Sequence, residues 1–245
     1  MQTPQYQVQP PYLLFLGDAT DVADAKTASG IRQWRGELCA GQLRLPEGTV
    51  DLGLPDLTPQ QAVAKGIKTL IIGIANDGGF IADNWVASLV GALEAGLDIA
   101  SGLHQRLSDT PAIAEAAKRT GRQLIEVRQP DHNFKPGSGK KRSGKRLLTV
   151  GTDCAVGKKY TALAIEKELR KRGVNADFCA TGQTGIFISG RGVAIDSVVA
   201  DFISGAAEWL SPENTPDHWD VVEGQGSLFH PSYAGVTLGL VHGTQ

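Results

Sequence analysis

Residues 147–159 read Leu-Leu-Thr-Val-Gly-Thr-Asp-Cys-Ala-Val-Gly-Lys-Lys, and this stretch decides the fold of the C-terminal half. The apolar run 147–150 is expected to form a strand, and residues 159–172 have the apolar spacing of a helix. A strand, a glycine-rich loop and a helix in this order are typical of a phosphate-binding loop, because backbone N–H groups and the helix N-terminus attract phosphate. We therefore predict a loop that binds a nucleotide or a nucleotide-bearing cofactor, formed by Gly151, Thr152, Asp153, Cys154, Ala155, Val156, Gly157 and Lys158.

This loop departs from the common pattern at two points. Five residues, not four, separate Gly151 from Gly157, and the position after Lys158 is Lys159 in place of the usual serine or threonine. That hydroxyl normally ligates Mg²⁺, whereas a lysine ammonium has no acceptor and carries positive charge. The loop is therefore predicted to hold a diphosphate without cleaving it, with Lys159 among the phosphate-binding residues and no metal ligand assigned.

The remaining sequence alternates short apolar runs with helical stretches, which is typical of α/β domains with mainly parallel sheets. Strands are expected at 12–16, 69–75, 97–101, 124–127, 147–150, 176–180 and 219–222. Helices are expected at 22–34, 85–95, 111–120, 159–172 and 195–210. A segment rich in glycine, proline and cations lies between the two series, so we predict an α/β domain at 12–134, a basic flexible linker at 135–146 and a P-loop α/β domain at 147–245.

The composition is that of an ordinary globular protein. Apolar residues make up 41% of the 245 residues and the net charge is −2. Charge therefore gives no reason to expect nucleic acid or an anionic membrane as a partner. The three cysteines are widely spaced, which favours a reduced, cytoplasmic protein. No apolar run reaches the roughly 18 residues that a membrane span needs.

Several stretches resemble known families. The letters Gly-Thr-Asp at 151–153, Val-Gly-Lys at 156–158 and Glu-Gly-Gln-Gly at 223–226 are similar to the dethiobiotin synthetase branch of P-loop proteins. Longer strings lie at 25–30, 42–46, 51–55, 102–104, 180–186, 199–202 and 222–231. With these strings the chain resembles, from about residue 12 to residue 245, a family long carried as a domain of unknown function and later linked to N-acetylation of D-glutamate.

The second resemblance implies a fold and an activity. It implies a Rossmann-like N-terminal domain, a P-loop NTPase-like C-terminal domain, acetyl-CoA as donor and D-glutamate or a similar amino acid as the small-molecule acceptor. The sequence Gly-Lys-Lys-Tyr-Thr at 157–161 is similar to that of the D-glutamate N-acetyltransferase members, so Lys159 is expected in this group. Members of the family continue past the position of Gln245, so we expect a C-terminally truncated second domain and association into a homo-oligomer.

Acetyl transfer to an amine requires a base that removes a proton from the ammonium. The segment 223–230 follows a predicted strand, and α/β proteins place ligands at the carboxyl ends of strands. Each end of this segment carries a candidate catalytic base, Glu223 and His230.

The same reaction requires hydrogen-bond donors for the oxyanion and a group that recognises the acceptor. Gln183 and Thr184 lie in a predicted Gly-Gln-Thr-Gly loop that offers amide and backbone donors. Arg191, between two glycines, is the candidate partner of a substrate carboxylate. Asp201, among apolar neighbours, is expected near the site rather than Asp196.

Two other functions stay open at this point. An ATP-dependent kinase or ligase of the dethiobiotin synthetase type would use ATP with Mg²⁺, with Glu223 as a metal ligand. A non-catalytic nucleotide-sensing module would bind the nucleotide without turnover. Lys159 favours the acetyltransferase over the kinase or ligase, and turnover of an amine would separate the acetyltransferase from the sensor.

Overall fold

The computed structural model describes residue 6, residues 8–130 and residues 132–245. They form two compact units, residues 6–128 and residues 129–245, called the first and the second unit below. Each unit contains one sheet, and every ladder between the described strands is parallel. The predicted pair of parallel α/β folds is therefore confirmed.

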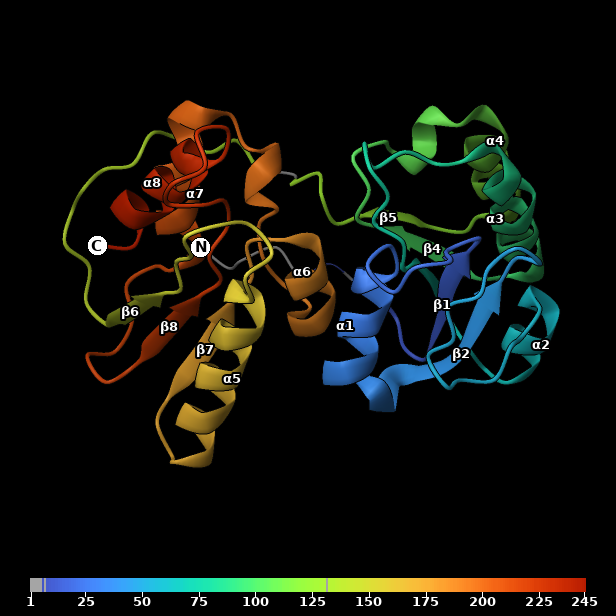
Figure 1. The fold of residues 1–245 in the computed structure, drawn as a ribbon, viewed down its shortest axis with the longest axis horizontal. Helices are drawn as coiled ribbons and strands as arrows, with labels where there is room; N and C mark the ends of the chain where they lie inside the picture. The colour runs from blue at the N-terminus through green and yellow to red at the C-terminus, as the bar shows by residue number, and fades with distance from the viewer. Residues whose placement is uncertain (1–5, 7, 131) are drawn as a thin grey trace. The chain divides into compact units, whose positions relative to one another are not determined.

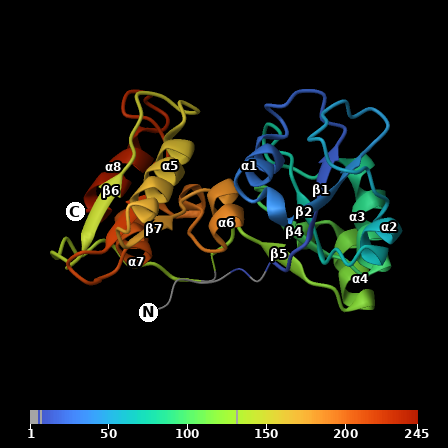
Figure 2. The same cartoon turned by 90° about the horizontal axis from the view of Figure 1, so that it is seen from below.

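The first unit is built on a five-stranded sheet with the order β2-β1-β3-β4-β5 (Figure 1). Its strands are β1 (Tyr12–Gly17), β2 (Cys39–Arg44), β3 (Thr69–Ile72), β4 (Asp98–Ser101) and β5 (Leu124–Glu126). Helix α1 (Lys26–Trp34) lies on one face of the sheet, and α2 (Pro59–Ala64), α3 (Asp83–Ala95) and α4 (Pro111–Thr120) lie on the other (Figure 2). This split follows because the strand order runs one way from β1 to β2 and the other way from β1 to β3, and right-handed crossovers then place helices on opposite faces.

The sequence explains the central strands and the helix ends of this unit. Strands β1 and β3 are buried along their whole length, as expected for apolar strands of a parallel sheet covered on both faces. Helix α3 ends at Gly96 (φ +107°) and α4 ends at Gly121 (φ +68°), the left-handed conformation that glycine adopts most easily. Both stops were predicted from the sequence.

The second unit has a three-stranded sheet with the order β6-β8-β7. Its strands are β6 (Lys145–Leu148), β7 (Ala176–Cys179) and β8 (Trp219–Val222). Helix α5 (Lys158–Lys171) covers one face, and α7 (Ile203–Leu210) packs with α8 (Ala234–Gly243) on the other (Figure 1). The core on the α7 side includes Cys179, Ile195, Ala206 and Leu240, all buried.

Residues 135–146, predicted as a linker, make contacts within the second unit. The backbone N–H groups of Ser138 and Gly139 donate to the Glu208 carboxylate, each at 2.9 Å. The Arg142 guanidinium donates to the carbonyl of Ser211 at 2.7 Å and to that of Gly243 at 2.6 Å. Residues 145 and 146 belong to β6.

The predicted helix at 195–210 is wrong in its first half. That part holds two short 3-10 helices, η3 (Ile195–Ser197) and η4 (Ala200–Phe202), and the backbone of Val199 between them has a ψ of 138°. The Ser197 hydroxyl donates to the Ala194 carbonyl at 2.7 Å, and such local bonds compete with helical ones. Only Ile203–Leu210 is α-helical.

One predicted strand and one predicted helix were longer than the observed elements, and some observed elements were not predicted. The strand expected at 69–75 ends at Ile72, because the N–H of Ala75 donates to the Asp24 carbonyl at 2.7 Å and leaves the sheet. The helix expected from residue 22 begins at Lys26. No element was predicted for β2, α2, α8 or the short helix α6 (Gln183–Ser189).

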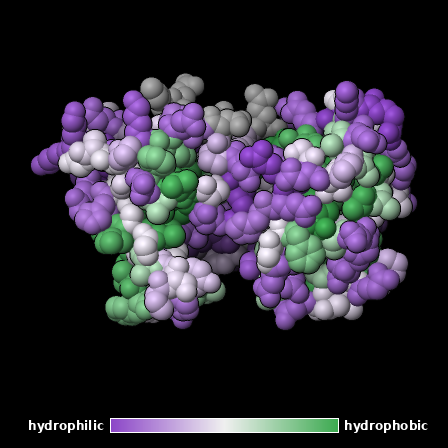
Figure 3. Space-filling model, turned by 90° about the horizontal axis from the view of Figure 1, so that it is seen from above, coloured by the Kyte–Doolittle hydropathy of each residue, from purple (hydrophilic) through white to green (hydrophobic). Residues whose placement is uncertain are grey.

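Hydrophilic and apolar side chains alternate over the surface of each unit on the face drawn in Figure 3. No helix within the described part of the chain has both the length and the apolar character needed to cross a membrane.

Candidate functional site

The predicted phosphate loop joins β6 to α5 in the second unit, so the strand–loop–helix context is confirmed. Two residues hold the loop in left-handed backbone conformations, Ala155 (φ +56°) and Gly157 (φ +101°). A Cβ at Gly151 would lie 2.6 Å from Cγ2 of Val156, so a side chain there would require the exposed Val156 side chain to shift. Residues 152–156 are exposed, so their backbone is accessible to a ligand.

The ammonium of Lys158 lies on the loop itself. Its Nζ donates to the Asp153 carbonyl at 2.8 Å, and the Asp153 carboxylate accepts from the Cys154 N–H at 2.7 Å. An ammonium has three N–H donors. Lys158 can therefore keep its bond to the Asp153 carbonyl and still donate two hydrogen bonds to phosphate oxygens.

The Thr149 side chain connects helix α5, which follows the phosphate loop, to the segment after β8. Its hydroxyl donates to the Lys158 carbonyl at 3.1 Å and accepts from the Gly224 N–H at 3.0 Å. A Cβ at Gly224 would lie 1.7 Å from the Thr149 carbonyl oxygen, so only glycine fits this approach. The first turn of α5 and the segment after β8 are therefore held together at one hydroxyl.

Glu223 follows β8 directly and is buried, with 2% of its surface exposed. Its Oε2 accepts from the backbone N–H groups of Thr181 at 2.9 Å and Gly182 at 3.2 Å. The Thr181 hydroxyl donates to the Glu223 carbonyl at 2.6 Å. A Cβ at Gly185 would lie 2.3 Å from Oε2, so Gly185 leaves room for this carboxylate, whereas a Cβ at Gly182 would lie 2.3 Å from Nε2 of Gln225.

The environment of Glu223 raises its proton affinity. Burial raises the pKa of the Glu223 carboxyl from its ordinary value of 4.5 to about 7, although the Thr181 N–H, the positive charge of Lys159 and the Gly182 N–H each act to lower it. The negative charge of Asp196 adds to the increase. Glu223 is therefore a buried carboxyl that exchanges its proton near neutral pH.

The segment after Glu223 is tied to the phosphate loop. The Ser227 hydroxyl donates to the Thr152 carbonyl at 2.8 Å, and the Leu228 N–H donates to the Gly151 carbonyl at 2.9 Å. His230 lies further along this segment, exposed, with its ring centroid 4.7 Å from that of Tyr233. The two candidate bases thus differ, because Glu223 is enclosed and His230 faces solvent.

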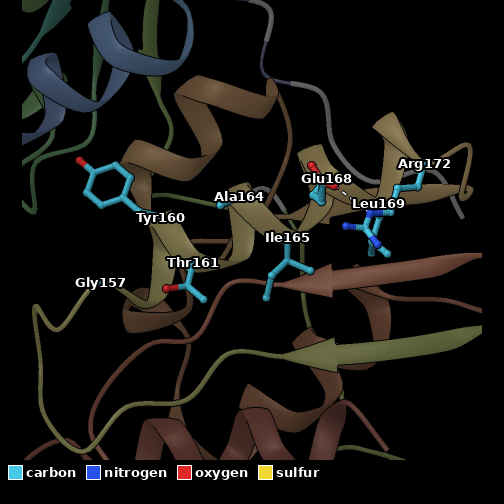
Figure 4. A pocket seen from close by; sticks show the side chains of 8 residues that line it. All are labelled: Gly157, Tyr160, Thr161, Ala164, Ile165, Glu168, Leu169 and Arg172. Atoms are coloured by element: carbon cyan, nitrogen blue, oxygen red, sulfur yellow. Dashed lines mark hydrogen bonds and ion pairs between the residues drawn. The ribbon is translucent and has the colours of Figure 1, made fainter.

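A groove of about 680 Å³ runs along α5 from the end of the phosphate loop (Figure 4). Its lining is mainly apolar near the middle of the helix and ends at the ion pair between Arg172 and Glu168, with Nε and Oε1 2.8 Å apart. The lining residues are Gly157, Tyr160, Thr161, Ala164, Ile165, Glu168, Leu169 and Arg172.

Comparison with known proteins decides the family. A family model described as the P-loop domain of DUF1611, a domain of unknown function, matches residues 135–245. The model of its Rossmann-like N-terminal domain matches residues 44–130. The chain belongs to the DUF1611 family. The resemblance inferred from the sequence and the predicted Rossmann-like and P-loop folds are thereby confirmed.

Two relatives of this chain have a named activity, and the structure of a third has been solved. Two curated relatives are named D-glutamate N-acetyltransferase, one from Tritonibacter scottomollicae, 55% identical over 238 residues, and one from a Pseudoalteromonas species, 50% identical over 239 residues. The matches cover 97% and 98% of this chain and 72% of each relative. The crystal structure of a DUF1611 family protein from Anabaena variabilis ATCC 29413 superposes with a TM-score of 0.80 at 31% identity, over 96% of this chain and 71% of that one. The chain is thus an enzyme of the N-acyltransferase class.

The substrate-binding residues predicted for this DUF1611 chain lie in different surroundings. Gln183 and Thr184 do not lie in a loop, because they begin α6, directly after the two residues that donate to Glu223. Arg191 forms an ion pair with Asp177 on β7, with Nη2 and Oδ2 2.9 Å apart. Asp201 is exposed on η4.

Three residues that contact or influence this candidate site were not predicted from the sequence. Thr149 and Thr181 look like ordinary β-branched residues at strand ends, and no pattern distinguished their hydroxyls. Asp196 was placed second to Asp201, yet its charge acts on Glu223. A signal for Thr149 was available in its position two residues before the first loop glycine, where its side chain lies beside the start of the loop.

Replacing Lys158 tests whether the loop is an anion site in this DUF1611 protein. Lys158→Ala is expected to weaken CoA binding by about 2 kcal/mol, because it removes charge-assisted hydrogen bonds to phosphate. Titration calorimetry measures this change, and Lys167→Ala on the same helix is the control. Equal affinities of Lys158→Ala and wild type would show that the loop does not hold the phosphates.

Proposed function

We propose that this chain transfers the acetyl group of acetyl-CoA to the amino group of D-glutamate or a close relative. Glu223 carries the proposal, because it is a buried carboxyl with a pKa of about 7 that is linked through Gly224 and Thr149 to the phosphate loop. A base that titrates near the working pH is best suited to deprotonate an ammonium. The names of the two curated relatives support transfer of an acetyl group and D-glutamate as the acceptor.

In this proposal the loop from Gly151 to Lys158 anchors the phosphates of CoA. Lys158 and Lys159 supply two positive charges at the start of α5, where the helix N-terminus also attracts anions. A diphosphate that serves only as an anchor needs charge neutralisation and no metal-assisted cleavage. The groove that begins at Gly157 is the proposed seat of the nucleoside part of the cofactor.

Glu223 is proposed to accept one proton from the acceptor ammonium. The amine nitrogen then attacks the thioester carbonyl carbon, the carbon–sulfur bond breaks, and the second proton lost by nitrogen ends on the leaving CoA thiolate. The Gly182 N–H already donates to Glu223, so it is not assigned to the oxyanion. Gln183 is the remaining proposed substrate contact on this side, because it follows Gly182 directly.

Incubation with acetyl-CoA and D-glutamate tests the proposal. We expect release of CoA thiol that depends on D-glutamate, together with an N-acetylated product identified by its mass. If the protein transfers phosphoryl groups from ATP with Mg²⁺ and does not bind CoA, it is a kinase or ligase and the proposal is wrong. Tight CoA binding without turnover of any amine would favour the nucleotide-sensing module.

The metal dependence of binding is a second expectation of this proposal. CoA binding should be unchanged by EDTA, since Lys159 stands where a hydroxyl would help to ligate Mg²⁺. Lys159→Thr is expected to weaken CoA binding and to make the affinity for ATP depend on Mg²⁺. Calorimetry with and without EDTA on both proteins measures this. Wild-type binding of ATP that requires Mg²⁺ would contradict the proposed role of Lys159.

A further inference from the structure

The proposed reaction has one requirement that no residue has yet been assigned to meet. When the amine nitrogen bonds to the thioester carbon, an electron pair of the carbonyl double bond moves to the oxygen, and it returns when the carbon–sulfur bond breaks. A hydrogen-bond donor is needed where this negative charge develops. The nitrogen that gives its proton to Glu223 and this oxygen are bonded to the same carbon, so the donor must lie beside the Glu223 carboxyl.

The side-chain amide of Gln225 lies beside this carboxyl. The position that a Cβ at Gly182 would take is 2.3 Å from Nε2 of Gln225 and 3.5 Å from Oε1 of Glu223. The two side chains therefore end at the same glycine, and the distance between these two atoms is smaller than the sum of the two values. The nitrogen of the amide is the atom turned toward Gly182, as the negative charge of the neighbouring carboxylate favours.

Both atoms are free to contact a substrate. Within the described part of the chain, Glu223 accepts hydrogen bonds only through Oε2, and the Gln225 side chain forms none. The fully buried side-chain atoms that lack a partner there include neither Oε1 of Glu223 nor Nε2 of Gln225. Each atom therefore keeps some contact with solvent, and the two N–H donors of the amide are available.

The backbone around Gln225 is held on both sides. The N–H of Gly224 donates to the Thr149 hydroxyl at 3.0 Å, and the Gln225 carbonyl accepts from the Thr237 hydroxyl at 2.8 Å. Gly226 has a φ of +73°, and a Cβ there would lie 2.4 Å from a backbone carbonyl oxygen. The amide is thus attached to a fixed segment, and a donor held in place in advance stabilises a developing charge at little cost in reorganisation.

We propose that the Gln225 amide donates a hydrogen bond to the thioester oxygen and stabilises the negative charge that forms on it. Glu223 then takes the proton from the attacking nitrogen while Gln225 acts on the oxygen bonded to the same carbon. This inference rests on the proposed acetyl transfer and adds a catalytic residue to it. Gln183 keeps its proposed contact with the acceptor.

Gln225→Leu tests the assignment, because leucine has a similar size and no donor. We expect kcat for thiol release from acetyl-CoA with D-glutamate to fall roughly 10²- to 10³-fold, the usual effect of losing one such donor. The dissociation constant of CoA, measured by calorimetry, should stay as in wild type, because the phosphate loop is unchanged. The midpoint of the pH profile should stay in place too, because the amide is not bonded to Glu223. Gln60→Leu, at an exposed position of α2, is the control.

A second variant guards against a folding defect. Gln225→Asn keeps the amide but shortens the side chain by one methylene, so it should show most of the same loss, and it replaces Gln225→Leu if the leucine variant has a lowered unfolding midpoint. Wild-type kcat in folded Gln225→Leu would overturn the assignment of Gln225 alone. A fall in kcat with a shifted pH midpoint would also overturn it, since Gln225 would then only position Glu223. A wild-type protein that releases no thiol would instead overturn the proposed acetyl transfer, and this assignment with it.

Discussion

Glu223→Gln is expected to lower acetyl transfer by roughly 10²- to 10⁴-fold, the usual contribution of a general base. Glutamine has nearly the same shape, and its amide oxygen can still accept from the N–H groups of Thr181 and Gly182. The loss therefore reports on proton transfer rather than on folding. Wild-type activity should rise with pH through about pH 7 as Glu223 loses its proton, because the base acts in its ionised form. Thiol release at fixed CoA concentration between pH 5 and 9 measures both effects.

The same variant is expected to make the folded protein more stable above pH 7. The folded-state pKa of Glu223, about 7, lies above the ordinary value of 4.5 for an unfolded chain. The stability that comes from proton binding is therefore complete below pH 4.5 and is lost as the pH rises through 7. Glutamine stays neutral throughout, so the variant keeps about 3 kcal/mol that the wild type loses.

Urea unfolding at pH 4 and pH 8 measures this difference, with Glu213→Gln, an exposed acid, as the control. We expect equal free energies of unfolding for Glu223→Gln and wild type at pH 4 and a clear excess for the variant at pH 8. If Glu223→Gln retains wild-type activity, or is less stable than wild type at pH 8, Glu223 is not the buried general base that we propose.

Gly224→Ala is expected to reduce the free energy of unfolding by about 3 kcal/mol, the upper end of the usual cost of overpacking. The added Cβ would lie 1.7 Å from the carbonyl oxygen of Thr149 and 2.8 Å from its carbonyl carbon. Both atoms are backbone, so a side-chain rotation cannot relieve the contact. The strands β6 and β8 would have to separate at the end that carries the phosphate loop, so CoA binding should weaken as well.

Gly235→Ala is the matched control for this variant. Gly235 lies in α8, and a Cβ there meets nothing within 4 Å. Alanine is favoured over glycine inside a helix, so this change should leave stability unchanged or slightly increased. Urea unfolding of both variants decides the matter, and a Gly224→Ala protein as stable as wild type would show that the close approach is not required.

The sequence predicted what depends on local patterns. The phosphate loop was found because its glycines and lysine lie close together in the chain and sit between a strand and a helix. Glu223 was chosen as a candidate base because it follows a strand, where a parallel sheet presents its ligands, and its role stays a prediction. The stops at Gly96 and Gly121 were found because glycine after a helical stretch has a distinct backbone preference.

What depends on contacts between distant residues was not predicted. The burial of Glu223 and its bonds to Thr181 and Gly182 join positions about forty residues apart, so no spacing revealed that its pKa would rise. Arg191 was predicted to bind a substrate carboxylate, yet it forms an ion pair with Asp177 on β7, which is distant in sequence. The apolar spacing of residues 195–210 fitted a helix, but the local bond of Ser197 ends the first turn early.

The charge of Lys159 has a thermodynamic consequence for phosphate binding. This ammonium lies over the ring of Tyr160, 4.5 Å from its centroid, and its charge lowers the proton affinity of Glu223. A bound phosphate would neutralise part of that charge, so Glu223 would hold its proton more tightly in the complex. By reciprocity, protonation of Glu223 strengthens phosphate binding by the same factor. Binding of a phosphate-bearing ligand at this loop is therefore expected to take up protons near pH 7, and its dissociation is expected to release them.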